Sequence, residues 1–370
     1  MIYKEVLFFI GKCLTISLEE KNKHEVEIQL KNTEIDWDFI VKISTAHYVF
    51  PALYCNLKRA NFLNYLPEEL VNYMVHITDL NRDRNQQIIE QAREINSLLL
   101  ENNITPIFLK GTGNLLEGLY EDIAERMVGD IDFIFSKNDY PNAIKVLTKF
   151  GYSKVHKNTY DPISFKHYPR IQKENKIAAV EIHKELLLEE YADEFNYSVV
   201  SISTLKIDKI NVMSYDNQLC LSIIAKQIND KGSHFKNIAL RNAYDVFLLS
   251  KKTIAKNSFV KYPKLFGPLN SFLATCFLVF GEINSLEYTK NKETENYISY
   301  FNKNLFNQKL ANKNYKKIEK NLFIKSRLSI VYQSIFKKEH RNWLIKRITD
   351  KKWQKEKLIR LGLKKPKPNP

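Results

Sequence analysis

The segment at residues 129–135, GDIDFIF, places two aspartates one residue apart inside an otherwise apolar run. The apolar residues predict a buried strand, and residues i and i+2 of a strand project from the same face. Asp130 and Asp132 would therefore present their carboxylates together, while Ile131 and Phe133 face the core. Two like charges this close repel each other, and burying either one unpaired is costly. A divalent metal ion would neutralise both. The alternative is a strand end whose aspartates cap a helix or face solvent.

A second strand-like segment, AVEIHKEL at residues 179–186, supplies a third carboxylate, Glu181, if it pairs beside the first strand. Mg²⁺ characteristically binds one or two protein carboxylates together with substrate phosphates and water. Three carboxylates can hold two such ions about 3.5 to 4 Å apart for in-line displacement at phosphorus. We therefore predict that Asp130, Asp132 and Glu181 are catalytic metal ligands for two Mg²⁺ ions, with Mn²⁺ as a substitute.

The turn LKGTGN, residues 109–114, precedes the aspartate pair in the chain. Gly111 and Gly113 would let the backbone approach a phosphate closely, and Lys110 would place an ammonium group beside it. The composition predicts a nucleotide phosphate site in a turn, between a short buried strand in ITPIFLKG and a helix through NLLEGLYED.

Hydrophobic periodicity divides the chain into four regions. Residues 1–103 carry apolar residues at spacings of three and four, which predicts helices. Residues 104–210 alternate short strands with helices and form the predicted α/β core. Residues 211–350 are again predicted to be helical, and the lysine- and proline-rich residues 351–370 predict a basic, disordered tail. The predicted fold class is α+β, a small mixed sheet with helices, flanked by N-terminal and C-terminal helical regions.

Composition favours a cytoplasmic globular protein. The 370 residues are 44% hydrophobic and 12% aromatic, enough for a large core. The four cysteines stand singly, which fits inert reduced thiols better than a zinc cage or a disulfide framework. No apolar run approaches the roughly 20 residues of a membrane span, and the first residues lack the pattern of a signal peptide.

The net charge of +15 comes from the C-terminal end. Residues 301–370 contain 21 Lys and Arg against 4 Asp and Glu, so the preceding 300 residues are nearly neutral. Such a region is suited to a polyanion such as RNA, an anionic membrane surface or a phosphorylated substrate. The alternative is a solvated helical surface in a lysine-rich protein.

The order of motifs in the chain resembles a known family. FLKG is followed by Arg126, GDIDFIF, HYP, VEIHKEL and RNAYDVFLL. This order is similar to a nucleotidyltransferase family of the DNA polymerase beta-like superfamily, over about residues 35 to 250. Members typically have a strand ending in LKG, two aspartates alternating with hydrophobic residues, a later strand with an acidic residue two positions before a histidine, and helical flanks.

The resemblance implies a polymerase-beta-like sheet and assigns roles to the carboxylates. Asp130 and Asp132 match the metal-binding pair of the family. Glu181 matches the third carboxylate, the usual candidate for the base toward an acceptor hydroxyl. The implied reaction is Mg²⁺-dependent transfer of a nucleoside monophosphate from an NTP, such as ATP, with release of pyrophosphate.

The resemblance also implies the phosphate contacts. Gly111 stands where the superfamily has a glycine-serine phosphate turn, with Lys110 before it. Thr112 occupies a position that is usually Gly or Ser. Arg126 matches a triphosphate or loop-anchoring contact.

Two histidines and one helical pair have alternative interpretations. His183 shares its strand face with Glu181, which suggests either a transition-metal ligand or a hydrogen bond to a carboxylate or substrate. His167, in KHYP, is either at the rim of the site or simply exposed. Arg241 and Asp245, four residues apart, predict an ion pair along one helix, with substrate contact as the alternative.

The predicted function is a nucleotidyltransferase whose acceptor hydroxyl belongs to a sugar or other small molecule, a protein or a tRNA. One alternative is a toxin-type nucleotidyltransferase that modifies tRNA, since an active core and a basic C-terminal region would serve it. Another is a catalytically inactive protein of the same fold that binds RNA or a partner. The presence of all three carboxylates favours an active enzyme.

Overall fold

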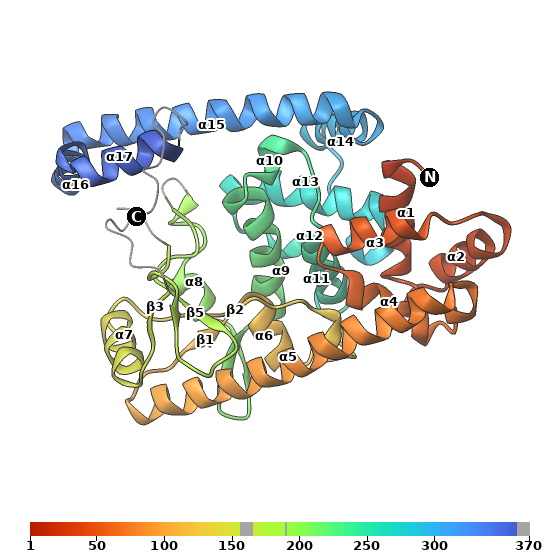
Figure 1. The fold of residues 1–370 in the computed structure, drawn as a ribbon, viewed down its shortest axis with the longest axis horizontal. Helices are drawn as coiled ribbons and strands as arrows, with labels where there is room; N and C mark the ends of the chain where they lie inside the picture. The colour runs from red at the N-terminus through yellow and green to blue at the C-terminus, as the bar shows by residue number, and fades with distance from the viewer. Residues whose placement is uncertain (156–165, 189–190, 361–370) are drawn as a thin grey trace, which may run out of the picture. The chain divides into compact units, whose positions relative to one another are not determined.

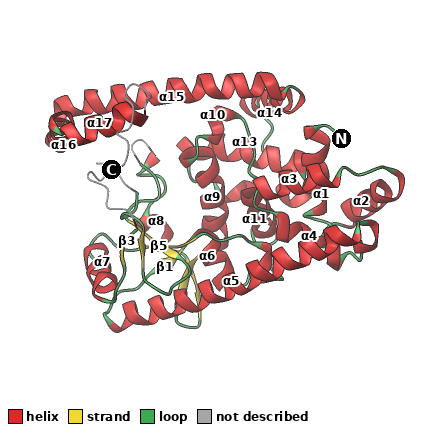
Figure 2. Ribbon diagram, viewed as in Figure 1, coloured by secondary structure: helices red, strands yellow, loops and turns green. Residues whose placement is uncertain are grey.

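The computed structural model describes residues 1–155, 166–188 and 191–360 of the chain, which divides into two compact units. The first unit holds the described residues up to Ala311, and the second holds those from Asn312 onward. In the first unit, N-terminal helices, a mixed sheet and a set of later helices follow one another along the chain (Figure 1). Figure 2 shows that helices make up most of this unit and that its strands are gathered in one part.

The N-terminal region is helical, as its periodicity predicts. Its helices are α1 (Tyr3–Cys13), α2 (Glu20–Asn32), α3 (Trp37–Ala46), α4 (Phe50–Arg59) and α5 (Glu68–Glu101). Pro67 precedes the first turn of α5, where Glu68 and Glu69 complement the positive end of the helix dipole. Buried residues recur along α5 at intervals of three or four, so one side of this long helix packs on the core.

Seven strands form one mixed sheet in the order β3-β4-β5-β2-β1-β7-β6. They are β1 (Ile107–Phe108), β2 (Asp130–Ile134), β3 (Ser153–Lys154), β4 (Ile171–Gln172), β5 (Ala179–His183), β6 (Thr204–Ile207) and β7 (Ile210–Met213). β2 runs parallel to β5 on one side and antiparallel to β1 on the other. Phe108 and Phe133 are fully buried and pack edge to face across β1 and β2. The predicted α+β class with a mixed sheet is confirmed.

The predicted phosphate turn LKGTGN is a helix start in the structure. Among the described residues, three α-helices lie between strands in the chain: α6 (Lys110–Leu116), α7 (Tyr140–Lys149) and α8 (Tyr197–Val200). The backbone of Gly113 donates to the carbonyl of Leu109 at 2.9 Å, which closes the first turn of α6. A Cβ on Gly113 would lie 2.9 Å from the carbonyl oxygen of Phe108 and 2.7 Å from Gln218 Nε2. Glycine is therefore needed here for close packing of α6 rather than for an open turn.

The remaining helices of the first unit follow the sheet. They are α9 (Tyr215–Ile224), α10 (Gly232–Phe235), α11 (Leu240–Ser250), α12 (Ala255–Ser258), α13 (Pro263–Val279) and α14 (Lys292–Phe306), with a π-helical turn at Ala225–Asn229 and a 3-10 turn at Asn284–Leu286. Two further 3-10 turns come earlier in the chain, Leu63–Tyr65 before α5 and Ile123–Glu125 before β2. All four cysteines are buried free thiols, as predicted. The predicted boundaries at residues 103 and 210 fall inside this unit, because α5 and α9 pack on α6 beside the sheet.

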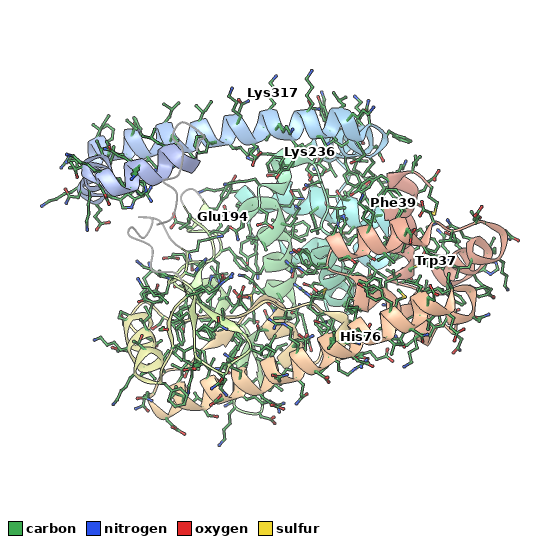
Figure 3. The ribbon with its side chains drawn as sticks, in the orientation of Figure 1. Trp37, Phe39, His76, Glu194, Lys236 and Lys317 are labelled. Carbon is green, nitrogen blue, oxygen red and sulfur yellow. The ribbon has the colours of Figure 1, made fainter. Side chains whose placement is uncertain are left out.

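The second unit is helical and basic. It contains most of α15 (Gln308–Phe336), then α16 (Lys338–Thr349) and α17 (Lys351–Arg360). Residues 351–360 form a helix rather than the predicted disordered tail, and Asp350 caps its start by accepting from the backbone of Trp353 at 3.0 Å. Residues 361–370 of that predicted tail lie outside the described residues. Lysines such as Lys317 project from α15 into solvent (Figure 3).

The described helices include no candidate for a membrane span. None of them combines the length and the apolar character that a bilayer span requires.

Candidate active site

The parallel register of β2 and β5 brings the three predicted carboxylates together. Asp132 lies directly opposite Glu181, and Asp130 lies one pleat earlier opposite Ala179. Because side chains alternate along a strand, Asp130 and Asp132 share one face of the sheet with Glu181 and His183. Ile131, Phe133, Val180 and Ile182 take the opposite face and are fully buried.

Lys110 and Arg170 add two cations to these side chains. We refer to Lys110, Asp130, Asp132, Arg170, Glu181 and His183 as the active-site cluster. All six lie in the first compact unit, on or beside β2, β4, β5 and the first residue of α6.

Asp132 is the most deeply placed carboxylate of the cluster, with only 7% of the residue exposed. Its Oδ1 lies 2.6 Å from Lys110 Nζ and 2.8 Å from His183 Nε2. Burial alone would raise the pKa of Asp132, but the Lys110 charge and the His183 hydrogen bond outweigh burial and hold this pKa well below its usual range. Asp132 is therefore ionised at neutral pH.

Asp130 and Glu181 share a single guanidinium group. Arg170 Nη2 lies 2.8 Å from Asp130 Oδ2 and 2.8 Å from Glu181 Oε1. Burial and the Glu181 charge raise the pKa of Asp130 to about 6, and Arg170 offsets only part of this rise. The repulsion expected between neighbouring carboxylates is thus present on this face of the sheet.

His183 is buried and lies between the carboxylates. Burial and the nearby Lys110 charge lower its pKa, which leaves a neutral imidazole at neutral pH. Its hydrogen bond to Asp132 confirms the predicted contact with a neighbouring carboxylate. Its Nδ1 has no hydrogen-bond partner among the described residues. One ligand atom each from Asp132, Glu181 and His183 lie within 4.8 Å of one another.

The donor set fits a divalent metal ion. Among the described residues, the salt bridges of these three carboxylates involve two cations, Lys110 and Arg170, so the carboxylates of the active-site cluster outnumber the cations that they bond. Carboxylate oxygens are the ligands that Mg²⁺ and Mn²⁺ prefer, and a neutral imidazole is compatible with Mn²⁺ or a later transition metal.

Lys110 has a strained backbone that Gln218 holds in place. Its φ of 52° lies in the left-handed region, which is uncommon for a residue other than glycine. Buried Gln218, on α9, accepts from the backbone nitrogen of Lys110 at 3.0 Å and donates to its carbonyl oxygen at 3.2 Å. This paired contact orients the Lys110 side chain toward Asp132.

The other predicted phosphate residues are buried in the protein. Gly111 is closely packed, since a Cβ would lie 3.0 Å from the Val128 side chain and 3.5 Å from the Arg126 guanidinium. Thr112 Oγ1 donates to the carbonyl of Asp130 at 2.9 Å and so fixes the start of β2 against α6. Direct contact of these two residues with a nucleotide stays a prediction.

Arg126 anchors a loop. Its Nε lies 2.9 Å from Asp245 Oδ1 and its Nη1 donates to the carbonyl of Met127 at 2.9 Å. The predicted pair of Asp245 with Arg241 is wrong, because Arg126 bonds Asp245 and Arg241 stacks on Tyr48 instead. Arg126 thus fits the loop-anchoring alternative, and contact with a triphosphate stays a prediction.

His167 lies beside the cluster rather than remote from it. It forms an isolated bridge with His183, and the two ring centroids are 5.3 Å apart. Its Nδ1 lies 2.9 Å from the carbonyl oxygen of Tyr168. The placement supports the interpretation of His167 as a residue at the rim of the site.

Sequence reasoning missed Arg170 and Gln218. Arg170 directly follows the HYP motif, so a basic residue next to a quoted motif was a usable signal. Gln218 lies 108 residues after Lys110 inside an ordinary helix, and nothing in its local sequence marks it.

Residues 33–278 match the family described as uncharacterised nucleotidyltransferase, so the chain belongs to that family. No curated protein matches the chain. Among solved structures, the chain is similar to JHP933 from Helicobacter pylori at 16% identity and a TM-score of 0.31, covering 65% of this chain and 95% of that one.

Proposed function

We propose that this chain is a divalent-metal-dependent nucleotidyltransferase that moves a nucleoside monophosphate from an NTP to an acceptor hydroxyl. The observation that carries the proposal is the parallel register of β2 and β5, which sets Asp132 opposite Glu181 with Asp130 on the same face. Membership of a nucleotidyltransferase family supports the same reaction class.

Each residue of the active-site cluster has a role in this proposal. Asp130, Asp132 and Glu181 would hold Mg²⁺, which when bound supplies charge neutralisation at the phosphates. Lys110 holds Asp132 ionised and places an ammonium group beside the incoming phosphates. His183 fixes the orientation of the Asp132 carboxylate through its hydrogen bond.

The chemical step is an in-line displacement at the α-phosphorus. The acceptor oxygen forms a bond to the α-phosphorus. At the same time the bond between the α-phosphorus and the oxygen that links it to the β-phosphorus breaks, and pyrophosphate leaves. The hydroxyl proton passes to a carboxylate, and Glu181 is the proposed base. Its side chain is 12% exposed, so part of the carboxylate meets solvent beside Arg170.

The candidates for the acceptor are a small molecule, a protein and a tRNA, because the fold alone does not determine the acceptor substrate. The basic second unit is the specific feature that favours an anionic acceptor such as tRNA, because residues 312–370 contain 19 Lys and Arg against 4 Asp and Glu, a net charge of +15.

Label transfer tests the reaction. Each NTP labelled at the α-phosphate is incubated with the full chain, Mg²⁺ and a cell extract, which is then separated into small molecules, protein and RNA. We expect one fraction to acquire label with the wild type and none with Glu181→Gln. Label in no fraction with any of the four NTPs, from folded protein, would overturn the proposal.

A further inference from the structure

Arg170 occupies the place where a cation is needed between two carboxylates. A single nitrogen, Nη2, lies 2.8 Å from Asp130 Oδ2 and 2.8 Å from Glu181 Oε1. These oxygens belong to neighbouring parallel strands, β2 and β5, so one guanidinium neutralises charge from both. Lys110 serves the third carboxylate, Asp132, at 2.6 Å.

The exposure of the Arg170 side chain distinguishes it from a buried cation with a purely structural role. Its side chain is 47% exposed, whereas the carboxylates that it bonds are 22% and 12% exposed. Exposed ion pairs are weak and exchange readily, because water solvates the separated partners. The guanidinium can therefore leave the two carboxylates without being stranded in the protein interior.

The backbone at Arg170 stays near the site when its side chain moves. Its carbonyl accepts from the backbone of Val155 at 3.0 Å, and the next residue, Ile171, pairs with Val180 on β5. Val180 directly precedes Glu181. A displaced guanidinium thus remains tethered within reach of anything bound at the carboxylates.

We propose, on the basis of the proposed function, that Arg170 is a resident counter-cation that a divalent metal ion displaces, and that the freed guanidinium then binds the NTP phosphates. Mg²⁺ sits about 2.0 to 2.1 Å from its oxygen ligands. An ion held by the Asp130 and Glu181 carboxylates would repel the guanidinium that these carboxylates bind in its absence. Phosphate oxygens are its natural new partners, since the guanidinium fork matches their geometry.

The exchange predicts coupled binding of metal and nucleotide. Metal alone must compete with Arg170, so its affinity is low. With nucleotide present, the displaced guanidinium regains an anionic partner, and each ligand strengthens the binding of the other. The free site is thereby protected from metal ions that arrive without a nucleotide.

Mn²⁺ binding to the full chain without nucleotide tests the first half of the exchange. Electron paramagnetic resonance of free Mn²⁺ would give the affinity of the wild type, Arg170→Ala and Lys173→Ala. Lys173 is a matched control, because it is a nearby cation whose ammonium lies over the Phe150 ring and not at the carboxylates. We expect about 10-fold tighter Mn²⁺ binding by Arg170→Ala, within the usual range of coupling, and no change in Lys173→Ala.

Nucleotide binding tests the second half. With Mn²⁺ saturating and an NTP analogue whose α,β bridge cannot be cleaved, Arg170→Ala should bind the nucleotide about 10-fold more weakly than the wild type. Arg170→Gln, which keeps most of the side-chain bulk, should give the same two shifts, and thermal unfolding confirms that each variant is folded.

The outcomes separate this inference from the proposed function. Mn²⁺ binding by the wild type with no gain in Arg170→Ala would overturn the counter-cation role and leave the nucleotidyltransferase proposal standing. Tighter Mn²⁺ binding with unchanged nucleotide affinity would overturn the phosphate role. Failure of every variant to bind Mn²⁺, with or without nucleotide, would overturn the proposed metal site itself.

Discussion

Two clusters of charged side chains in the first unit use the same residue types, but their charges are balanced differently. The second cluster joins the N-terminal helices to α11 through the loop before β2. We name it the helix-loop cluster, and it consists of Arg59, Tyr120, Glu125, Arg126, Tyr244 and Asp245. Its two buried carboxylates, Glu125 and Asp245, pair with the guanidinium groups of Arg59 and Arg126, and the exposed Glu121 also lies 3.4 Å from Arg59 Nε. The active-site cluster instead sets three carboxylates against two cations.

Every carboxylate of the helix-loop cluster is fully engaged by the protein. Glu125 lies 2.6 Å from Arg59 Nη1 and 2.5 Å from the Tyr244 hydroxyl, which donates to it. Asp245 accepts from Tyr120 at 2.8 Å as well as from Arg126. Buried charges persist only when such partners satisfy them.

The comparison teaches which charges are available to a ligand. A buried cluster with matched charges has nothing left to offer, so its role is to fix the loop that leads into β2. The active-site cluster has one carboxylate in excess, an exposed guanidinium and an imidazole nitrogen without a hydrogen-bond partner among the described residues, so its oxygens are available to a cation.

The largest expected effect is on turnover, from Asp132→Asn. The amide keeps the shape of the side chain but loses the charge that would hold a metal ion, so nucleotide transfer should fall by about 10³-fold or more. The free energy of unfolding should fall less than in a matched variant of the helix-loop cluster, because Lys110 keeps Glu181 as a partner and is partly hydrated. Wild-type transfer by Asp132→Asn would show that the active-site cluster is structural.

The next prediction is a loss of stability from Asp245→Asn. This variant leaves Arg126 charged and only 8% exposed without its carboxylate, and breaking a buried pair costs about 3 to 5 kcal/mol. Urea unfolding measures the loss. Transfer per folded molecule should change far less than in Asp132→Asn, and an equal loss of transfer at unchanged stability would reverse the assignment of the two clusters.

These two variants also show how far the sequence alone defines the site. Strand periodicity is a local property, so the shared face of Asp130 and Asp132 was predictable, and so was that of Glu181 and His183. The pairing of β2 with β5 agreed with the prediction, in which this pairing brings the third carboxylate beside the first two. The partner of Asp245 was predicted wrongly, since helical spacing favoured Arg241 while Arg126, 119 residues away, forms the bond.

Contacts between distant segments set the limit of such predictions. The start of α6 could not be separated from a turn, because Lys110 adopts its left-handed conformation only with Gln218 against its backbone. The position of Arg170 likewise depends on the register of β4 against β5. Neither contact leaves a periodic pattern in the local sequence.

A third prediction concerns the effect of pH on stability through His47, which lies outside both clusters. His47 accepts from the backbone of Leu240 through Nδ1, and burial together with the Lys226 charge lowers its pKa to about 4. Below pH 6.5 the unfolded chain gains a proton that the folded chain does not, so stability falls as the pH drops from 6.5 toward 4.

The full loss from His47 should reach about 3 kcal/mol near pH 4. Urea unfolding across this range should show a shallower decline for His47→Asn, whose side-chain oxygen can replace Nδ1 as an acceptor. Identical slopes for the variant and the wild type would mean that other groups cause the acid sensitivity.

The smallest predicted effect comes from Gln218→Ala, which tests whether the active-site cluster depends on a residue that touches no carboxylate. Loss of the paired contact should loosen Lys110 and lower transfer by about 10-fold, with Mn²⁺ affinity nearly unchanged. Gln227→Ala is the matched control, because this buried glutamine bonds Tyr297 and not Lys110. Equal transfer by the two variants would remove Gln218 from the positioning of Lys110.

Both the core packing of the sheet and the ionic contacts of the active-site cluster depend on the parallel register of β2 and β5. A slip of one residue would turn Glu181 and His183 into the apolar core and push Val180 and Ile182 to the charged face, since side chains alternate along a strand. The misregistered sheet would lose both its core packing and its ionic contacts at once. A chain that has assembled this sheet wrongly is therefore unstable as well as inactive, so few folded molecules would carry a defective site.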